Sequence, residues 1–521
     1  MSQMLKSSGA LATATLTSRI LGMVREIVYA QFMGDGAVAS AFKLAFQIPN
    51  LFRRLLGEGA LSAAFIPIFK TKEKNEGEKE MWRSANAVIS GMVIVAAGIV
   101  ALVMLGISLI LAVKDFDANT HLMLLLLRMM FPYMLVICLT AIFMGMLNAR
   151  GHFFIPAAGA VVLNLVMIAS VLFLAPRMGR ELNRQIFGLA IGVLIAGVAY
   201  AAFQLPALRR EGFRYRWVTP WRDETVRQVV LKMIPGAMGV AAFQMNVLVT
   251  NGVAFWVDPQ IVASFDYAVR LMELPQGVFG ISLATYLLPT LSGLVAEKKY
   301  PEFRSTLQQG LSYLIFVNLL ASVLLVVLAE PIIRLLFERG QFDAGSTQRA
   351  AFALACLAPG LVAFSMVNVL ARAFYALGDT QTPMKISVVC LGLNLVFALW
   401  LIVPFRQGGL GIANTLTAGC NVGLLLYALR RKLSRLELAP LIRVLPAMLG
   451  SAAVAGAAAW MTGSYWEGSL GHEGLPARLG AVFAPMALAG LVYWGITCYL
   501  QVPAAKEIAS VFLQRLRAGP K

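Results

Sequence analysis

Long hydrophobic runs, separated by short polar segments, dominate the hydropathy pattern of the chain. The runs are 21 to 32 residues long, and an α-helix needs about 20 apolar residues to cross a bilayer. Fourteen runs are therefore predicted to be membrane-spanning helices: 10–34, 39–69, 84–113, 122–148, 154–175, 186–208, 228–255, 262–293, 305–329, 348–377, 382–404, 409–429, 440–462 and 477–501. The pattern predicts an all-α polytopic membrane protein.

Composition narrows the class of protein further. Hydrophobic residues make up 59% of the 521 residues and charged residues 13%, against about 25% charged in a soluble domain. These values exclude a disordered chain and argue strongly against a soluble enzyme. The net charge of +18 does not indicate nucleic-acid binding, because no compact basic domain carries it. Loops on one side of the predicted membrane instead carry roughly three times as many Lys and Arg as loops on the other side. This excess predicts that both termini lie in the cytoplasm.

The chain contains an internal repeat. Three pairs of residues recur at an interval of 227 positions: Pro132 and Pro359, Gly151 and Gly378, and Pro156 and Pro383. Six predicted spans separate the copies, so both halves should have the same orientation, an arrangement found in transporters. The predicted organisation is an N-lobe (1–209), a cytoplasmic linker (210–227), a C-lobe (228–431), and two further spans with the tail (432–521).

Charged residues inside the first two spans are the main candidates for function. Each costs about 2.5–3.5 kcal/mol at the bilayer centre on insertion scales. They are Arg19, Arg25, Glu26, Lys43, Arg53, Arg54 and Glu58. A cavity for a phosphate-bearing ligand would explain the basic excess, because the planar guanidinium suits phosphate. The alternative is that some of these arginines snorkel to an interface or form structural ion pairs.

Two other spans carry charges at depth. Arg270 and Glu273 are three residues apart on one predicted helix face, and Asp266 precedes Arg270 by four. We expect these residues either to form a structural salt bridge or to act on the substrate, as a ligand contact or a gate. Arg372 lies near the predicted cytoplasmic end of span 348–377.

Sequence segments outside the spans add two expectations. Residues 209–227 hold six basic residues and two tryptophans, typical of an amphipathic segment at an anionic leaflet, although a plain charged loop is an equal alternative. The partly apolar outer loop 330–349 is expected to pack over an outer opening. Scattered histidines, cysteines within apolar segments and the lack of a Walker A loop predict no metal site, no cofactor and no ATP hydrolysis.

Several motifs resemble one known family. The segments SRILGMVREIVYAQFMG, AFKLAFQIPNLFRRLLGEGALSAAFIPIF, YAVRLMELPQGVFGISLATYLLPTLS and ARAFYALGDTQTPMKI are similar to those of the MurJ (MviN) family. Its members are lipid II flippases of the multidrug/oligosaccharidyl-lipid/polysaccharide exporter superfamily. The resemblance implies two six-helix lobes around a V-shaped central cavity, with two C-terminal helices that form a groove for the polyprenyl tail.

The resemblance also implies roles for individual residues. The family's cavity arginines match Arg19, Arg25, Arg53, Arg54 and Arg270, which we expect to bind substrate. Glu58, Glu273, Asp266 and Arg372 are expected to serve in gating or ion pairing. The chain departs from some members at Ser40, Val269 and Asn368, where those members carry charged residues, so the details of gating are in question.

The function predicted from these features is transfer of lipid II, an undecaprenyl-pyrophosphate disaccharide-pentapeptide, to the outer leaflet by alternating access. The expected location is the bacterial cytoplasmic membrane. The expected partners are lipid II, membrane lipids and other cell-wall synthesis proteins, with the protein a monomer that is driven by the membrane potential or an ion gradient. The alternatives are a flippase for another polyprenyl-pyrophosphate oligosaccharide, a cation-coupled multidrug exporter and, least favoured, a membrane-embedded transferase.

Overall fold

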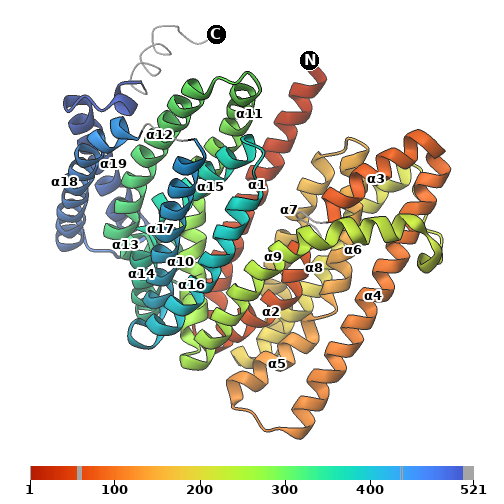
Figure 1. Cartoon of the computed structure of the whole chain (residues 1–521). Coiled ribbons are helices and arrows are strands. Elements are labelled where there is room, and N and C mark those ends of the chain that lie inside the picture. Colours follow the sequence, from red (N-terminus) through yellow and green to blue (C-terminus); the bar gives the residue numbers. More distant parts are fainter. Residues whose placement is uncertain (1, 56–60, 434–435, 437, 508–521) are drawn as a thin grey trace. The chain divides into compact units, whose positions relative to one another are not determined.

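The structure is a computed structural model that describes residues 2–55, 61–433, 436 and 438–507. Within these residues the secondary structure is helical and contains no strand (Figure 1). The helices form two compact units. Unit 1 comprises Met1–Ala263 with Arg339–Gln341, and unit 2 comprises Ser264–Glu338 with Phe342–Lys521.

Unit 1 is built mainly from nine α-helices and the start of a tenth. They are α1 (Ser2–Met33), α2 (Ala37–Leu55), α3 (Leu61–Glu76), α4 (Glu78–Val113), α5 (Ala118–Met130), α6 (Tyr133–Ala149), α7 (Phe154–Ala169), α8 (Leu182–Arg210), α9 (Glu224–Val257) and the first residues of α10 (Gln260–Pro275). Short helical segments η2 (Ser170–Leu174) and η3 (Ala175–Met178) extend α7, and η4 (Pro220–Arg222) precedes α9. Because α9 packs on α2, α3 and α4, this unit extends past the predicted lobe boundary at residue 209. The predicted lobe division, which rests on the repeat, stays a prediction.

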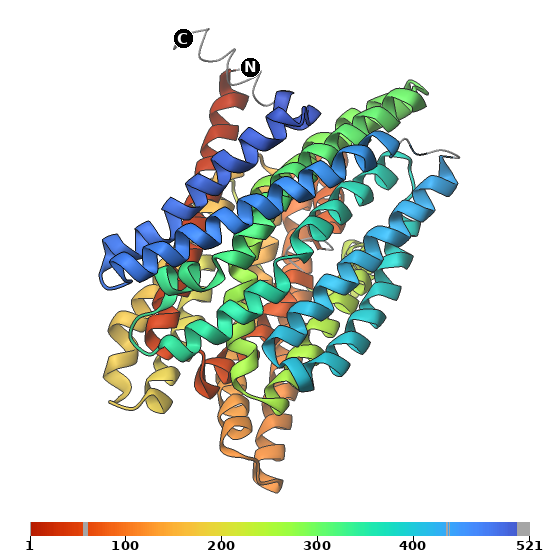
Figure 2. The ribbon, with the colours of Figure 1, turned by 90° about the vertical axis from the view of Figure 1, so that its left-hand side faces the viewer.

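Unit 2 continues from α10 to the end of the described chain. Its elements are η5 (Gln276–Ile281), α11 (Ser282–Ala296), α12 (Tyr300–Val327), α13 (Ala329–Phe337), α14 (Ala344–Leu357), α15 (Gly360–Ala376), α16 (Gln381–Phe405), α17 (Gln407–Lys432), α18 (Ala439–Leu470) and α19 (Leu475–Tyr499). The last two helices form a hairpin that packs on α12 and α13 (Figure 2). The predicted outer loop 330–349 thus contains a helix, α13, with a buried apolar side.

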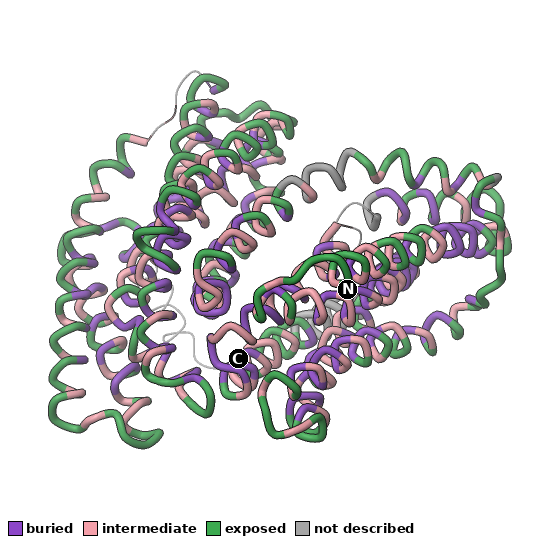
Figure 3. Tube along the Cα trace, turned by 90° about the horizontal axis from the view of Figure 1, so that it is seen from below, coloured by how far each residue is buried: buried purple, intermediate pink, exposed green. Residues whose placement is uncertain are grey.

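Each of the fourteen predicted spans coincides with a long helix or with consecutive helices. Among the described residues, nine helices are long and apolar enough to cross a membrane, or up to eleven if two bent pairs each count as one span. Spans 10–34, 39–69 and 228–255 are outside this set, and the first two contain the charged residues singled out above. Exposed positions run along the helices and not only at their ends (green in Figure 3). The chain is an all-α polytopic membrane protein.

The two bent pairs lie at the repeated prolines. The bend between α5 and α6 measures 43° at Pro132, and that between α14 and α15 measures 47° at Pro359. Proline has no N–H to donate, so it breaks the helical hydrogen-bond ladder. At the second bend, hydroxyl groups from other helices donate to carbonyls just before Pro359, and the N–H of Leu361 also donates to the carbonyl of Ala358 at 3.0 Å. Ser322 Oγ donates to the carbonyl of Ala358 at 2.8 Å, and Thr415 Oγ1 donates to that of Cys356 at 3.1 Å.

The repeated glycines also adopt the same backbone conformation. Gly151 has φ of +84° and Gly378 has φ of +74°, and each ends the turn after a bent pair. Side-chain-bearing residues rarely adopt this left-handed conformation, which explains glycine at both positions. The repeat seen in the sequence is therefore a repeat of local structure within each unit.

Candidate functional site

Buried charges in unit 1 centre on one carboxylate of α1. Arg25 Nη2 lies 2.5 Å from Glu26 Oε1, and Lys43 Nζ of α2 lies 3.8 Å from Glu26 Oε2. The three side chains are only 16%, 5% and 9% exposed for arginine, glutamate and lysine. Arg25 also lies 5.5 Å from the ring centroid of Tyr29, within cation–π distance. This positive trio, Arg25, Glu26 and Lys43, carries one more positive than negative charge.

Asn164 of α7 connects the positive trio to the backbone of α1 about two turns earlier. Arg25 Nη1 donates to Asn164 Oδ1 at 3.1 Å, and Asn164 Nδ2 donates to the carbonyl of Ser18 at 3.3 Å. Asn164 is buried, so both of its bonds are formed away from solvent. No charge marks this residue in the sequence.

Arg19 lies apart from the trio, in a cavity of about 390 Å³ within unit 1. Thr15, Ser18 and Arg19 of α1 line it together with Asn148 of α6 and Tyr200 of α8. The side chain of Arg19 is exposed. Polar groups at a cavity inside a hydrophobic helical unit suit a ligand with a charged part.

Three other predicted residues belong to the second predicted span. Arg53 and Arg54 lie in the last turn of α2, and the backbone continues as a helix through Pro49. Arg54 is half-buried. Glu58 lies outside the described residues.

In unit 2, the predicted pair on α10 is formed. Arg270 Nη1 lies 3.1 Å from Glu273 Oε2, with side chains 34% and 49% exposed. Asp266 lies on the same helix and is half-buried. The helix changes to the wider π-helical form in η5 directly after Pro275, and such segments often occur at functional sites. The functional roles predicted for these residues stay predictions.

Arg372 of α15 lies over an aromatic ring of its own helix. Its guanidinium carbon is 5.8 Å from the ring centroid of Tyr375, a residue that is 39% exposed. This contact keeps the arginine at a half-buried position. The structure describes no ion pair for Arg372, so its predicted role in gating stays a prediction.

The three departures from the family's charged positions are accommodated by neutral contacts. The hydroxyl of Ser40 accepts from the backbone N–H of Ala263 at 3.0 Å. Val269 packs on a hydrophobic cluster with Met272. Asn368 donates to the carbonyl of Phe364 in its own helix at 3.1 Å.

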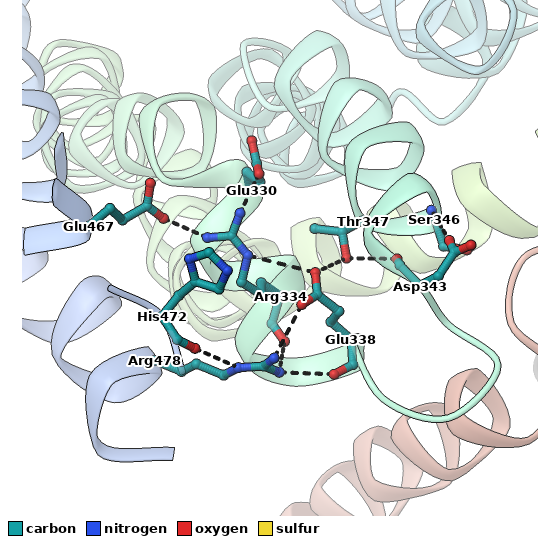
Figure 4. Close-up of polar contacts among 9 residues, drawn as sticks. All are labelled: Glu330, Arg334, Glu338, Asp343, Ser346, Thr347, Glu467, His472 and Arg478. Carbon is teal, nitrogen blue, oxygen red and sulfur yellow. Dashed lines mark hydrogen bonds and ion pairs between the residues drawn. The ribbon is translucent and has the colours of Figure 1, made fainter. Parts of the chain in front are cut away.

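Polar clusters that the sequence analysis did not predict link helices at the ends of unit 2. Figure 4 shows Arg334 of α13 with Glu330, Glu338 and Glu467. Its Nη1 lies 2.6 Å from Glu467 Oε1 on α18. Arg478 of α19 donates to the carbonyl of Glu338 at 2.9 Å. The α18–α19 hairpin is thereby held to α13.

The turns that follow the bent helices form a further pair of contacts. In unit 1, His152 Nε2 lies 2.8 Å from Glu211 Oε1, and Arg150 Nε donates to Glu211 Oε2 at 2.7 Å. In unit 2, Lys432 Nζ donates to Asp379 Oδ2 at 2.6 Å. These hydrogen bonds lower the pKa of Glu211 and hold the pKa of Asp379 well below its ordinary value. We call these two contacts the turn clasps.

No group of three or more His, Cys, Asp or Glu side chains that could hold a metal ion occurs among the described residues. All five cysteines are free. The candidate functional side chains among the described residues are therefore cations, carboxylates and amides that lie on helices.

Comparisons with known proteins agree with this arrangement. Residues 29–478 match the family model described as "Lipid II flippase MurJ". A probable lipid II flippase MurJ from Haemophilus influenzae is 33% identical over 439 residues, which cover 80% of this chain and 84% of that protein. A solved lipid II flippase MurJ in an inward closed conformation matches with a TM-score of 0.78 at 22% identity, over 94% of this chain and 98% of that one. An inward-facing multidrug MATE transporter of the MOP superfamily matches with a TM-score of 0.63 at 15% identity, over 82% and 98%.

Hydrophobic helices with buried cations, in this fold, define a polytopic α-helical membrane protein. The likeness to the solved structures concerns the fold, and the match to the family model extends over most of the chain. The chain belongs to the MurJ family of lipid II flippases.

Proposed function

We propose that the protein moves lipid II from the inner to the outer leaflet of the bacterial cytoplasmic membrane, with membrane arginines binding the pyrophosphate. The positive trio carries this proposal, because it places two cations, at 16% and 9% exposure, beside the carboxylate of Glu26 on α1 and α2. Arginine binds phosphate oxygens through two parallel bonds.

The transport step that we propose is alternating access between two six-helix lobes. Moving lipid II requires no bond chemistry; it requires a polar passage that shields a large anionic headgroup from lipid tails. Arg19, at its cavity, and Arg270 of α10 are proposed to contact the headgroup as well. The lipid tail would stay in the bilayer throughout.

The orientation and energy source form part of the same proposal. The excess of Lys and Arg in alternate loops supports cytoplasmic placement of both termini. We propose that the protein acts as a monomer without a bound cofactor, beside other cell-wall synthesis proteins. An inside-negative membrane potential would favour the inward return of a cationic, unloaded passage, since one charge across 100 mV corresponds to about 2.3 kcal/mol.

The test measures lipid II exposed to a probe that acts only outside the cell, in a strain depleted of its own flippase. The parent gene should restore exposure, whereas Arg19→Glu and Arg53→Glu should reduce it at least about tenfold, because each reversal removes a charge-assisted bond. Arg180→Glu, an exposed arginine outside the helices, is the matched control and should retain exposure.

Two outcomes would contradict the proposal. Normal lipid II exposure by both reversal variants would exclude the arginine–pyrophosphate contact. Failure of the well-expressed parent to restore lipid II exposure, together with restored export of another polyprenyl-linked oligosaccharide, would identify a different substrate.

A further inference from the structure

The segment between α8 and α9 lies across α4. We call residues 209–222 the linker strap. Asn86 Nδ2 on α4 donates to the carbonyl of Arg214 at 3.1 Å, and Ser90 Oγ lies 3.2 Å from Tyr215 Oη. These bonds fix the strap at one level along α4.

Two apolar side chains of the strap are buried in unit 1. The ring of Phe213 lies 5.5 Å from that of Trp82 and 6.2 Å from that of Phe143. Pro220 lies so close to α4 that a Cβ atom at Gly91 would be 3.1 Å from it. The strap therefore has its own anchors in the hydrophobic core.

The remaining aromatic rings of the strap are exposed, although the hydroxyl of Tyr215 reaches Ser90 of α4. Tyr215, Trp217 and Trp221 are 51%, 60% and 71% exposed. Because Phe213 and Pro220 already fill the interior positions, the exposed rings are not required for packing within unit 1. Exposed tryptophan and tyrosine on a membrane protein are typical of the interface between lipid and water.

The strap is also strongly basic. It contains one acidic residue, Glu211, and five arginines: Arg209, Arg210, Arg214, Arg216 and Arg222. The four arginines that precede Trp217 are exposed. Glu211 is bonded to Arg150 and His152, so its charge is already matched by groups outside the strap. The exposed face of the strap is therefore cationic and aromatic.

The position of the strap along α4 coincides with one edge of a lipid-facing stretch. Large apolar side chains of α4 are exposed at Val95, Leu102, Leu105, Leu109, Ile110 and Val113. Nineteen helical residues, from Val95 to Val113, span about 28 Å, close to the thickness of about 30 Å of a bilayer's hydrocarbon core. The strap contacts α4 at Asn86 and Ser90, immediately before this stretch begins.

We propose that the linker strap binds anionic phospholipid headgroups of the cytoplasmic leaflet and anchors unit 1 at that surface. The arginines supply attraction to the phosphate and the two tryptophans enter the interface. Each basic residue near an anionic membrane contributes roughly 1 kcal/mol, which is about a fivefold change in affinity. The inference rests on the proposed membrane orientation and does not depend on lipid II as substrate.

The test titrates the detergent-solubilised full-length protein with short-chain phosphatidylglycerol, short-chain phosphatidylcholine or glycerol 3-phosphate. The signal is the part of the tryptophan fluorescence that is lost in the Trp217→Phe/Trp221→Phe variant. We expect a blue shift with phosphatidylglycerol, at least about tenfold weaker binding of phosphatidylcholine, and no response to glycerol 3-phosphate. Replacing two arginines, Arg214→Gln/Arg216→Gln, should weaken phosphatidylglycerol binding about thirtyfold.

A matched control removes the same charge elsewhere. Arg430→Gln/Arg431→Gln alters two exposed arginines at the end of α17 and should leave the strap signal unchanged. If Arg214→Gln/Arg216→Gln folds poorly, Arg209→Gln/Arg210→Gln provides the same test. Any of four results would overturn the proposal. They are equal binding of the two phospholipids, a response to glycerol 3-phosphate alone, a response to an RNA oligonucleotide alone, and equal effects of the strap and control variants.

Discussion

Arg25 and Asn164 join two helices that are 139 residues apart in the chain, through a hydrogen bond of 3.1 Å between Nη1 and Oδ1. The same amide donates to the carbonyl of Ser18. Asn164 is thus a positioning residue for the stretch of α1 that carries both Arg19 and Arg25. A neutral side chain fixes where the cations lie.

Asn164→Ala should therefore impair transport while the protein remains folded. Loss of the bond to a charged group corresponds to about 1.5–3 kcal/mol, and misplacing Arg25 should reduce lipid II exposure about tenfold or more. Asn318→Ala is the control, because Asn318 is equally buried but its amide donates within its own helix. Equal effects of the two alanine variants would show that Asn164 acts only in packing. The measurement is the outside-probe assay, normalised to the amount of protein in the membrane.

The Arg270–Glu273 pair permits a test that separates substrate binding from structural pairing. Arg270→Glu should abolish complementation of a flippase-depleted strain. The exchange Arg270→Glu/Glu273→Arg restores a pair on the same helix face, but it moves the cation by one turn. If Arg270 contacts pyrophosphate, the exchange variant should remain inactive, whereas full recovery would indicate a structural salt bridge. Thermal stability should change little in either variant, because exposed pairs contribute roughly 0–1 kcal/mol.

The contact between α13 and the terminal hairpin should stabilise unit 2. Arg334→Gln leaves the carboxylate of Glu467 without its guanidinium partner, at a position where the arginine is 12% exposed, whereas Glu338 keeps its contact with Arg478. The expected loss is about 1–3 kcal/mol, measured as a lower thermal-denaturation midpoint and faster proteolysis near Gly471. Arg443→Gln, at an exposed position of α18, is a control of equal charge. An unchanged midpoint for Arg334→Gln would show that packing alone holds the hairpin.

The turn clasp of unit 2 should respond to acid in a defined direction. The bond from Lys432 lowers the pKa of Asp379, so the folded state favours the charged carboxylate. The resulting stability is fully present above the ordinary pKa of aspartate, about 3.9, and disappears as the pH falls below it. Between pH 6 and 8 the clasp should be insensitive to pH.

Variants of the same clasp allow its energy to be isolated. Asp379→Asn and Lys432→Gln should each lower the denaturation midpoint slightly, by less than about 1 kcal/mol, and the double variant should be no worse than either single one. Asparagine keeps an acceptor for the backbone N–H of Thr382, so helix capping is retained. Additive losses would mean that the two residues do not interact.

Much of the fold was predictable because membrane helices have a simple sequence signature. Runs of apolar residues predicted every long helix. Proline and glycine at equal spacing predicted a repeat, but not the two bends and two left-handed turns that the structure shows at these residues. The helix α13 was not predicted, because nine residues with apolar and charged positions intermixed look like a loop when hydropathy is averaged over the length of a span.

The candidate site was predictable only where it is charged. A charged residue inside an apolar run is costly in a membrane, so Arg25, Lys43 and Arg270 could be identified as candidate functional residues from the sequence. Asn164 was not, because a neutral amide carries no charge to mark it, and its value depends on a partner 139 residues away. The pairing of Arg334 of α13 with Glu467 of α18 likewise depends on a tertiary contact between two helices.

The hydroxyl groups at the second proline bend have a consequence for motion. Ser322 of α12 and Thr415 of α17 donate to the carbonyls of Ala358 and Cys356, in addition to the backbone bond from Leu361 to Ala358. Lipid tails contain no substitute donor. Straightening or sliding the bent helix alone would break both hydroxyl bonds, so the bend couples the motion of this helix to that of α12 and α17.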